Sequence, residues 1–148
     1  MATQEHFEQD SPRIVVVGLG YVGLPLAVAL AKRFDTWGLD INETRIAELR
    51  DGYDRTHEID ADALSASTLH LTAAPADCPP ADFYIVTVPT PVDDAKRPDL
   101  RMVEAASRTV AAMLDASRKP IVVYESTVYP GVTEELCGAI LELSLIHI

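Results

Sequence analysis

The chain has 148 residues, of which 48% are apolar and 24% charged, a composition typical of a globular domain and not of a disordered chain or a coiled coil. Its length allows one domain of ordinary size and excludes a second full one. Twelve basic against 23 acidic residues give a net charge of −11, a field that repels phosphate backbones and anionic membranes and so argues against nucleic-acid or membrane binding.

Residues 1–12 are polar and acidic and end at a proline, which predicts a flexible leader instead of a basic and then apolar signal peptide. No apolar run approaches the ~18 residues that a membrane span needs. The two cysteines, Cys78 and Cys137, lack the spacing of metal ligands, and we interpret them as reduced structural thiols. These features predict a cytoplasmic protein without a metal site.

Strands and helices are expected to alternate from residue 13 onward. Arg13–Val17 is short, β-branched and almost wholly apolar, which predicts a strand buried on both faces. Apolar residues then recur at helical spacing over 22–33. A second strand is expected over Thr36–Asp40 and a second helix over Asn42–Asp51, whereas Gly52–Ala66 is polar and acidic and is assigned no element.

The second half of the chain continues this alternation. Strands are predicted over Thr68–Thr72, Ala81–Val88 and Pro120–Tyr124, and helices over Leu100–Met113, capped by Asp99, and over Gly131–Leu141. Strands that alternate with helices pair in parallel through right-handed crossovers. The sequence therefore predicts an α/β fold with a doubly wound, Rossmann-like parallel sheet.

A glycine-rich run follows the first predicted strand and precedes the first helix. It reads G-x-G-x-x-G and consists of Gly18, Leu19, Gly20, Tyr21, Val22 and Gly23. In such a run the first glycine makes the tight turn, the second lets the backbone approach a pyrophosphate, and the third lets helix and strand pack closely. The helix N-terminus adds unpaired amides and a positive dipole end, which allows an acidic protein to bind a dinucleotide. A tight turn without a ligand is the alternative interpretation.

Asp40 ends the second strand 22 positions after Gly18, where a carboxylate can accept hydrogen bonds from an adenosine ribose and would repel a 2′-phosphate. We therefore expect NAD as the cofactor, not NADP. Arg45 is compatible with two roles, covering the adenine side of the pocket or pairing with a nearby acid. S-adenosylmethionine domains also combine a glycine-rich turn with an acid after the second strand, but Gly23 favours a dinucleotide.

Four segments resemble the UDP-glucose/GDP-mannose dehydrogenase family over most of 13–142. They are Val16–Ala27, Gly38–Leu49, Val86–Leu100 and Tyr124–Glu135. Gly52–Glu58 and the block ESTVYPG are similar to the branch that acts on UDP-N-acetylhexosamines. The resemblance implies a four-electron oxidation of a sugar C6 hydroxyl to a carboxylate, with NAD as oxidant. It also implies that 13–142 is a truncated N-terminal NAD-binding domain and that 143–148, which departs from the family pattern, is an atypical tail produced by truncation.

The resemblance also implies roles for individual residues. The turn 18–23, Asp40 and Arg45 would bind the adenosine diphosphate part of NAD. Val88, Pro89 and Thr90 would line the pocket beneath it, and Ser126 and Thr127 would lie near the nicotinamide and the reacting carbon, with Thr127 acting in catalysis. From the residues alone, a turn or cap role for Thr127 is equally compatible.

A UDP-sugar substrate and a homodimer of the full-length protein follow from the same resemblance. The family's nucleophilic cysteine belongs to a motif beyond residue 148, so this chain alone is expected to be inactive. Two alternatives remain. Another NAD-dependent hydroxyacid-type dehydrogenase would share the glycine run but would not explain the VPTP and ESTVYPG blocks, and a non-catalytic nucleotide-binding module would explain the missing nucleophile.

Overall fold

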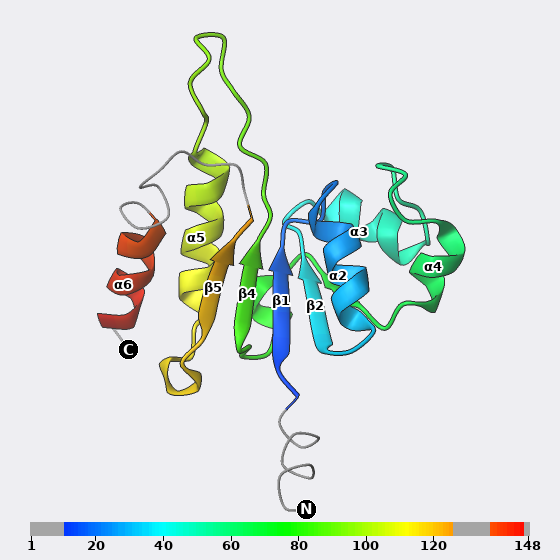
Figure 1. The fold of residues 1–148 in the computed structure, drawn as a ribbon, viewed down its shortest axis with the longest axis horizontal. Helices are drawn as coiled ribbons and strands as arrows, with labels where there is room; N and C mark the ends of the chain where they lie inside the picture. The colour runs from blue at the N-terminus through cyan, green and yellow to red at the C-terminus, as the bar shows by residue number, and fades with distance from the viewer. Residues whose placement is uncertain (1–10, 126–136, 147–148) are drawn as a thin grey trace, which may run out of the picture.

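Five parallel strands form one sheet in the computed structural model, which describes residues 11–125 and 137–146. The strands are β1 (Arg13–Val17), β2 (Asp35–Leu39), β3 (His70–Thr72), β4 (Phe83–Val86) and β5 (Ile121–Tyr124). Their order across the sheet is β3-β2-β1-β4-β5 (Figure 1). This order, with every pairing parallel, confirms the predicted doubly wound Rossmann-like fold.

The helices connect these strands. They are α2 (Gly23–Ala31), α3 (Glu43–Arg50), α4 (Ala61–Ala66), α5 (Arg101–Met113) and α6 (Ala139–Ile146), with short 3₁₀ turns η1 (Pro75–Asp77) and η2 (Ala116–Arg118). Helix α4 was not predicted from the sequence, because only Leu64 of this short helix is buried and no apolar period marks it. Asp60 caps α4 by accepting a hydrogen bond from the amide of Ala63 at 2.7 Å.

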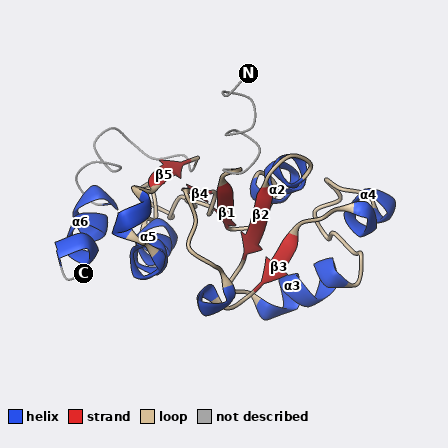
Figure 2. Ribbon diagram, turned by 90° about the horizontal axis from the view of Figure 1, so that it is seen from below, coloured by secondary structure: helices blue, strands red, loops and turns tan. Residues whose placement is uncertain are grey.

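Two apolar clusters cover opposite faces of the sheet. Ile14 and Val16 of β1 pack with α2, α3 and α4, whereas Val15 and Val17 pack with α5. Figure 2 shows α2 and α4 on one side of the sheet and α5 on the other. Because both faces of β1 are buried, its sequence is continuously apolar and does not alternate.

The chain turns in opposite directions after β1 and β4, which are neighbours in the sheet. After β1 it passes through α2 to β2 on one side, and after β4 it passes through α5 to β5 on the other. The carboxyl ends of these two strands therefore form the topological switch point, where open α/β sheets bind ligands. The connection from β4 to α5 extends beyond this edge (Figure 1) and is closed by an antiparallel bridge between Val92 and Pro98.

The boundaries of several predicted elements shift. α2 begins at Gly23, and the N-cap position of α5 is Leu100 and not Asp99, although Asp99 Oδ1 accepts a hydrogen bond from the Arg101 amide at 3.0 Å. The predicted helix over 131–141 lies partly outside the described residues, and α6 continues to Ile146 through much of the predicted tail. Most of the predicted leader, 1–10, also lies outside them.

None of the helices described is both long and apolar enough to cross a membrane. In the same parts of the chain, no three side chains of His, Cys, Asp or Glu gather in a way that could hold a metal ion.

Candidate functional site

Two glycines of the turn are required by close packing against β4. Gly18 has a φ of +96°, and a Cβ there would lie 3.0 Å from Val88 Cγ1. At Gly23 a Cβ would lie 1.8 Å from the carbonyl oxygen of Gly18 and 2.4 Å from Thr87 Oγ1. Thr87 Oγ1 donates a hydrogen bond to that same carbonyl at 2.6 Å. The turn is therefore closed tightly onto the end of β4, and only glycine fits at either position.

The middle of the turn, in contrast, is open. A Cβ added at Gly20 would meet no atom within 4 Å, and the side chains of Tyr21 and Val22 are exposed. Within the part of the chain that the structure describes, the amides of Gly20, Tyr21 and Val22 bond no acceptor. They lie at the N-terminus of α2, whose first turn carries no acidic residue. Three free donors at a positive dipole end fit a pyrophosphate.

Asp40 follows β2 directly and contacts the turn. Its Oδ2 accepts a hydrogen bond from the amide of Leu19, and its Oδ1 accepts one from the amide of Asn42, both at 3.0 Å. The side chain is only half-buried, and a carboxylate offers about four acceptor positions. Asp40 therefore fixes the turn and keeps acceptor capacity for ribose hydroxyls.

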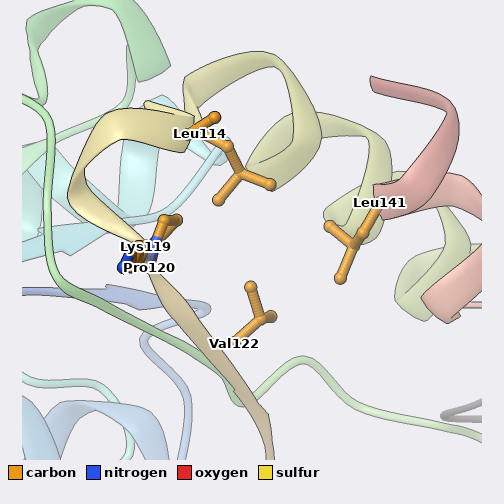
Figure 3. Close-up of a pocket in the computed structure, with 6 residues that line it drawn as sticks. Leu114, Lys119, Pro120, Val122 and Leu141 are labelled. Carbon is orange, nitrogen blue, oxygen red and sulfur yellow. The ribbon is translucent and has the colours of Figure 1, made fainter. Parts of the chain in front are cut away.

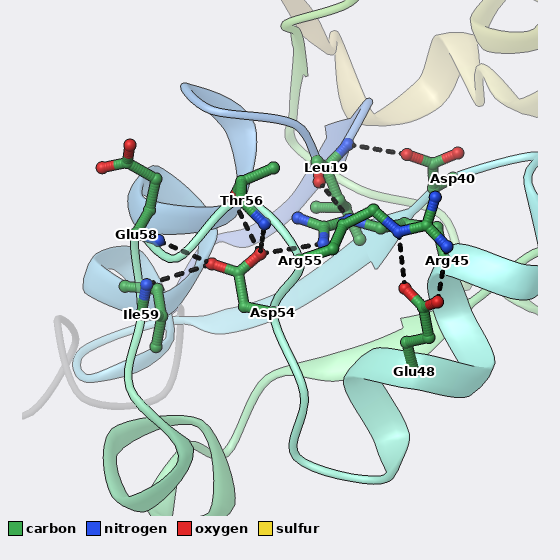
Figure 4. A network of polar contacts seen from close by, with 9 residues as sticks. All are labelled: Leu19, Asp40, Arg45, Glu48, Asp54, Arg55, Thr56, Glu58 and Ile59. Atoms are coloured by element: carbon green, nitrogen blue, oxygen red, sulfur yellow. Dashed lines mark hydrogen bonds and ion pairs between the residues drawn. The ribbon is translucent and has the colours of Figure 1, made fainter.

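Arg45 of α3 is buried and holds the other side of Leu19. Its Nε donates to the Leu19 carbonyl and its Nη1 to Asp54 Oδ1, each at 2.8 Å (Figure 4). Its Nη2 is buried and has no partner among the described residues. Arg45 therefore pairs with an acid, which is one of the two roles proposed from the sequence. Its Nη2 is a buried donor that remains unused by the residues that the structure describes.

The acid that pairs with Arg45 was not identified from the sequence. Asp54 is 4% exposed and lies in the loop after α3. Burial alone would raise the pKa of its carboxyl, but hydrogen bonds from Thr56, Arg45 and the Ile59 amide outweigh burial and lower the pKa far below its usual range. Asp54 is therefore ionised at neutral pH. In the sequence, Asp54 is marked only by a Thr two residues later in a polar stretch. This is a common turn pattern, and it does not indicate a partner in α3.

The remaining predicted site residues lie at the same edge of the sheet or outside the described residues. Val88 packs beside Gly18, Pro89 is exposed and Thr90 is half-buried, all directly after β4. Ser126 and Thr127 lie outside the described residues, so their place near the nicotinamide stays a prediction.

A shallow apolar pocket lies away from this edge, between the end of α5, the start of β5 and α6 (Figure 3). It is lined by Leu114, Ala116, Lys119, Pro120, Val122 and Leu141. Because Pro120 precedes β5 and Leu114 follows α5, the pocket is near the amino ends of the strands, opposite the glycine turn. It is no part of the dinucleotide site.

The sequence model of the NAD binding domain of the UDP-glucose/GDP-mannose dehydrogenase family matches residues 12–145. The chain belongs to this family. NAD is accordingly the cofactor of this domain. The open turn at Gly20, its three free amides and the half-buried Asp40 fit a dinucleotide with an unmodified ribose.

Known members of the family resemble this domain over most of its length. It is 51% identical over 131 residues to the UDP-N-acetyl-D-glucosamine 6-dehydrogenase of Pseudomonas aeruginosa. The aligned residues make up 88% of this chain and 31% of the relative. It is 49% identical to protein CapL of Staphylococcus aureus over 87% of this chain and 30% of the relative. The structure of UDP-D-ManNAc dehydrogenase from Pyrococcus horikoshii superposes with a TM-score of 0.79 at 36% identity, covering 89% of this chain and 32% of that one. The chain thus spans about a third of the length of these relatives.

Proposed function

We propose that this chain is the NAD-binding part of an enzyme that oxidises the C6 hydroxyl of a UDP-N-acetylhexosamine, UDP-N-acetylglucosamine or UDP-N-acetylgalactosamine, to the uronate. The observation that carries the proposal is the open glycine turn, with the free amides of 20–22 beside Asp40. The 51% identity to a UDP-N-acetyl-D-glucosamine 6-dehydrogenase supports the substrate class.

In this proposal each group of the site has a separate task. The amides of the turn and the N-terminus of α2 bind the pyrophosphate, and Asp40 accepts hydrogen bonds from the adenosine ribose. Arg45 contributes to binding of the adenosine diphosphate part by holding the Leu19 carbonyl of the turn. Val88, Pro89 and Thr90 line the pocket beneath it. NAD, when bound, supplies the hydride acceptor for the oxidation.

Ser126 and Thr127 are proposed to lie beside the nicotinamide and the reacting carbon. A threonine hydroxyl donates and accepts a hydrogen bond at once, so Thr127 can position a water or a substrate hydroxyl for reaction. This role completes the catalytic part that we assign to the chain. We assign the nucleophilic step to residues that this chain does not include, since the chain covers 31% of the Pseudomonas aeruginosa relative.

The proposal also includes a cytoplasmic location and a homodimer of the full-length protein. Two free thiols, at Cys78 and Cys137, suit a reducing compartment. Light scattering of a full-length protein carrying this chain tests the dimer, and a monomeric mass at micromolar concentration would contradict it.

The cofactor assignment is tested by calorimetric titration of the chain with NAD and with NADP. We expect NAD to bind more tightly, because Asp40 repels a 2′-phosphate. Asp40→Asn removes that charge and should therefore reduce the difference between the affinities for NAD and NADP. Tighter binding of NADP to the unmodified chain would refute the assignment.

The substrate and the role of Thr127 are tested in a chimera. Residues 13–142 replace the matching segment of the Pseudomonas aeruginosa relative, and NADH formation is followed with UDP-N-acetylglucosamine, UDP-N-acetylgalactosamine and UDP-glucose. We expect turnover of the N-acetylated sugars and a loss of at least about tenfold in kcat with Thr127→Ala. Thr109→Ala, at an exposed hydroxyl on α5, is the matched control. Unchanged kcat in Thr127→Ala would remove the catalytic role.

A further inference from the structure

The ion pair of Arg45 and Asp54 is buried beside the cofactor site. The side chains of Arg45 and Asp54 are 7% and 0% exposed, and Nη1 lies 2.8 Å from Oδ1. Two charges removed from water are costly to bury unless further hydrogen bonds satisfy them.

Asp54 has no capacity left for a ligand. Its Oδ1 accepts hydrogen bonds from Arg45 and from the amide and hydroxyl of Thr56, at 2.7 to 3.0 Å. Its Oδ2 accepts from the amides of Glu58 and Ile59, at 2.9 and 3.0 Å. Because the carboxylate is saturated and its side chain is inaccessible, any effect of Asp54 on a cofactor must pass through Arg45.

Arg45 in turn determines the orientation of one peptide group in the turn. Its Nε binds the carbonyl oxygen of Leu19 at 2.8 Å. The peptide unit is planar and trans, so the Leu19 carbonyl and the Gly20 amide lie in one plane and point in opposite directions. Fixing the carbonyl towards Arg45 therefore fixes the Gly20 N–H away from it. That amide is one of the three donors left free for the pyrophosphate.

We infer that Asp54 is a positioning residue for the dinucleotide, acting through Arg45 and the Leu19–Gly20 peptide group. The inference rests on the proposed role of the turn in binding NAD. Figure 4 shows the connection, from the loop that contains Asp54, through Arg45 of α3, to Leu19 in the turn. Asp40 holds the amide of Leu19 at the same time, so both peptide groups that flank Leu19 are fixed by side chains.

A double-mutant cycle on the 148-residue chain tests this inference. Asp54→Asn keeps the shape of the side chain but removes its charge, and we expect NAD to bind at least about tenfold more weakly. In an Arg45→Met background the same substitution should change NAD affinity less than about twofold, because Asp54 then has no arginine through which to affect the turn. Arg45→Met leaves Asp54 four hydrogen bonds in its own loop, so the background variant keeps that loop intact. Equal losses in both backgrounds would overturn the inference.

Thr56→Val is the matched control, because it removes one donor to Asp54 Oδ1 without touching Arg45. It should leave NAD affinity within about twofold of the unmodified chain. A loss as large as that of Asp54→Asn would show that the loop as a whole matters and not the connection to Arg45, and would overturn the inference.

A measurement without cofactor separates this inference from the proposed function. In amide NMR spectra of the free chain, Asp54→Asn should shift the Gly20 resonance and Thr56→Val should not. An unshifted Gly20 resonance in Asp54→Asn would overturn the inference even if the chain binds NAD. Failure of the unmodified chain to bind NAD, with the Gly20 shift present, would refute the function and leave the positioning intact.

Discussion

Gly20 and Gly23 lie three residues apart in the same turn, but a Cβ atom meets open space at Gly20 and the carbonyl oxygen of Gly18 at Gly23. The first glycine leaves room for a ligand, whereas the second leaves room for the protein itself. Mutation of each should therefore change a different property: affinity at Gly20 and stability at Gly23.

Gly23→Ala should lower the free energy of unfolding by about 3 kcal/mol, because the added methyl forces the α2 N-terminus away from β4. Gly20→Ala should change it by less than ~1 kcal/mol but weaken NAD binding at least about tenfold, since the methyl occupies the approach of the pyrophosphate. Urea unfolding and calorimetry measure the two properties. A stability loss in Gly20→Ala equal to that in Gly23→Ala would contradict this division.

The Cys78 thiol should be unreactive near neutral pH. Burial, with a smaller effect of the Asp77 charge, raises its pKa to about 11. Because the thiolate is the nucleophile, iodoacetamide labelling of the folded chain should be slow at pH 8 and accelerate towards pH 11. Labelling in urea, where both thiols are free, gives the reference rate. Equally fast labelling of Cys78 in the folded and the unfolded chain at pH 8 would contradict a half-buried thiol with a raised pKa.

At the scale of elements, the sequence predicted best the boundaries of β1, whose residues are buried on both faces of the sheet. The β1 boundaries agree at both ends, and the predicted β2 and β5 differ by one residue. Burial of both faces gives a continuous apolar run, which is visible without knowledge of the partners. α4 was missed because its stability depends on Leu64 and a cap, not on an apolar period.

The site was predicted only in part, for a related reason. The glycines and Asp40 form a pattern that is local in sequence or fixed in spacing. Thr87 binds the carbonyl of Gly18, 69 residues away in the sequence, and Asp54 binds Arg45, 9 residues away. The residues that flank Thr87 and Asp54 in the sequence do not identify these partners. Such contacts depend on the register of the sheet and on the course of a polar loop.

Thr87 joins the ends of two neighbouring strands, and its hydroxyl can be tested separately from its shape. Thr87→Val removes the hydrogen bond to the half-buried Gly18 carbonyl and leaves that acceptor with one donor fewer, which should lower the free energy of unfolding by ~1–2 kcal/mol. NAD affinity should fall as the turn loosens. Thr87→Ser keeps the hydroxyl and should retain the affinity. Equal NAD affinities in the valine variant and the unmodified chain would contradict the role in the turn.

For the whole molecule, the charge of −11 and the binding of an anionic cofactor are compatible because they act over different distances. The net charge acts through solvent and is screened within about 8–10 Å at physiological salt. The free amides and the α2 dipole act at contact distance, where they bind a pyrophosphate. An acidic domain can therefore exclude polyanions in general and still bind one dinucleotide.

Acid should destabilise the domain, and Asp54 should account for a separable part of the effect. Its carboxyl has a much lower pKa in the folded chain than the ~3.9 of an unfolded aspartate. A lowered folded pKa means that the unfolded state binds more protons, so this stabilisation is complete above about pH 5 and declines as pH falls below about 4. Asp54→Asn should cost about 3–5 kcal/mol at pH 7, and the difference from the unmodified chain should shrink towards pH 2.

Asp99→Asn provides the matched comparison for this pH dependence. The hydrogen bond from Arg101 lowers the pKa of Asp99 to about 2, but this pair is on the surface. Its effect on unfolding should be small and should weaken in salt, whereas that of the buried Asp54 should persist. Protonation of the other carboxylates also reduces the −11 charge, but that change is nearly common to both variants and cancels between them. Chemical unfolding from pH 7 to pH 2, at low and high salt, measures both differences, and a constant cost of Asp54→Asn across that range would contradict an ionised, buried Asp54.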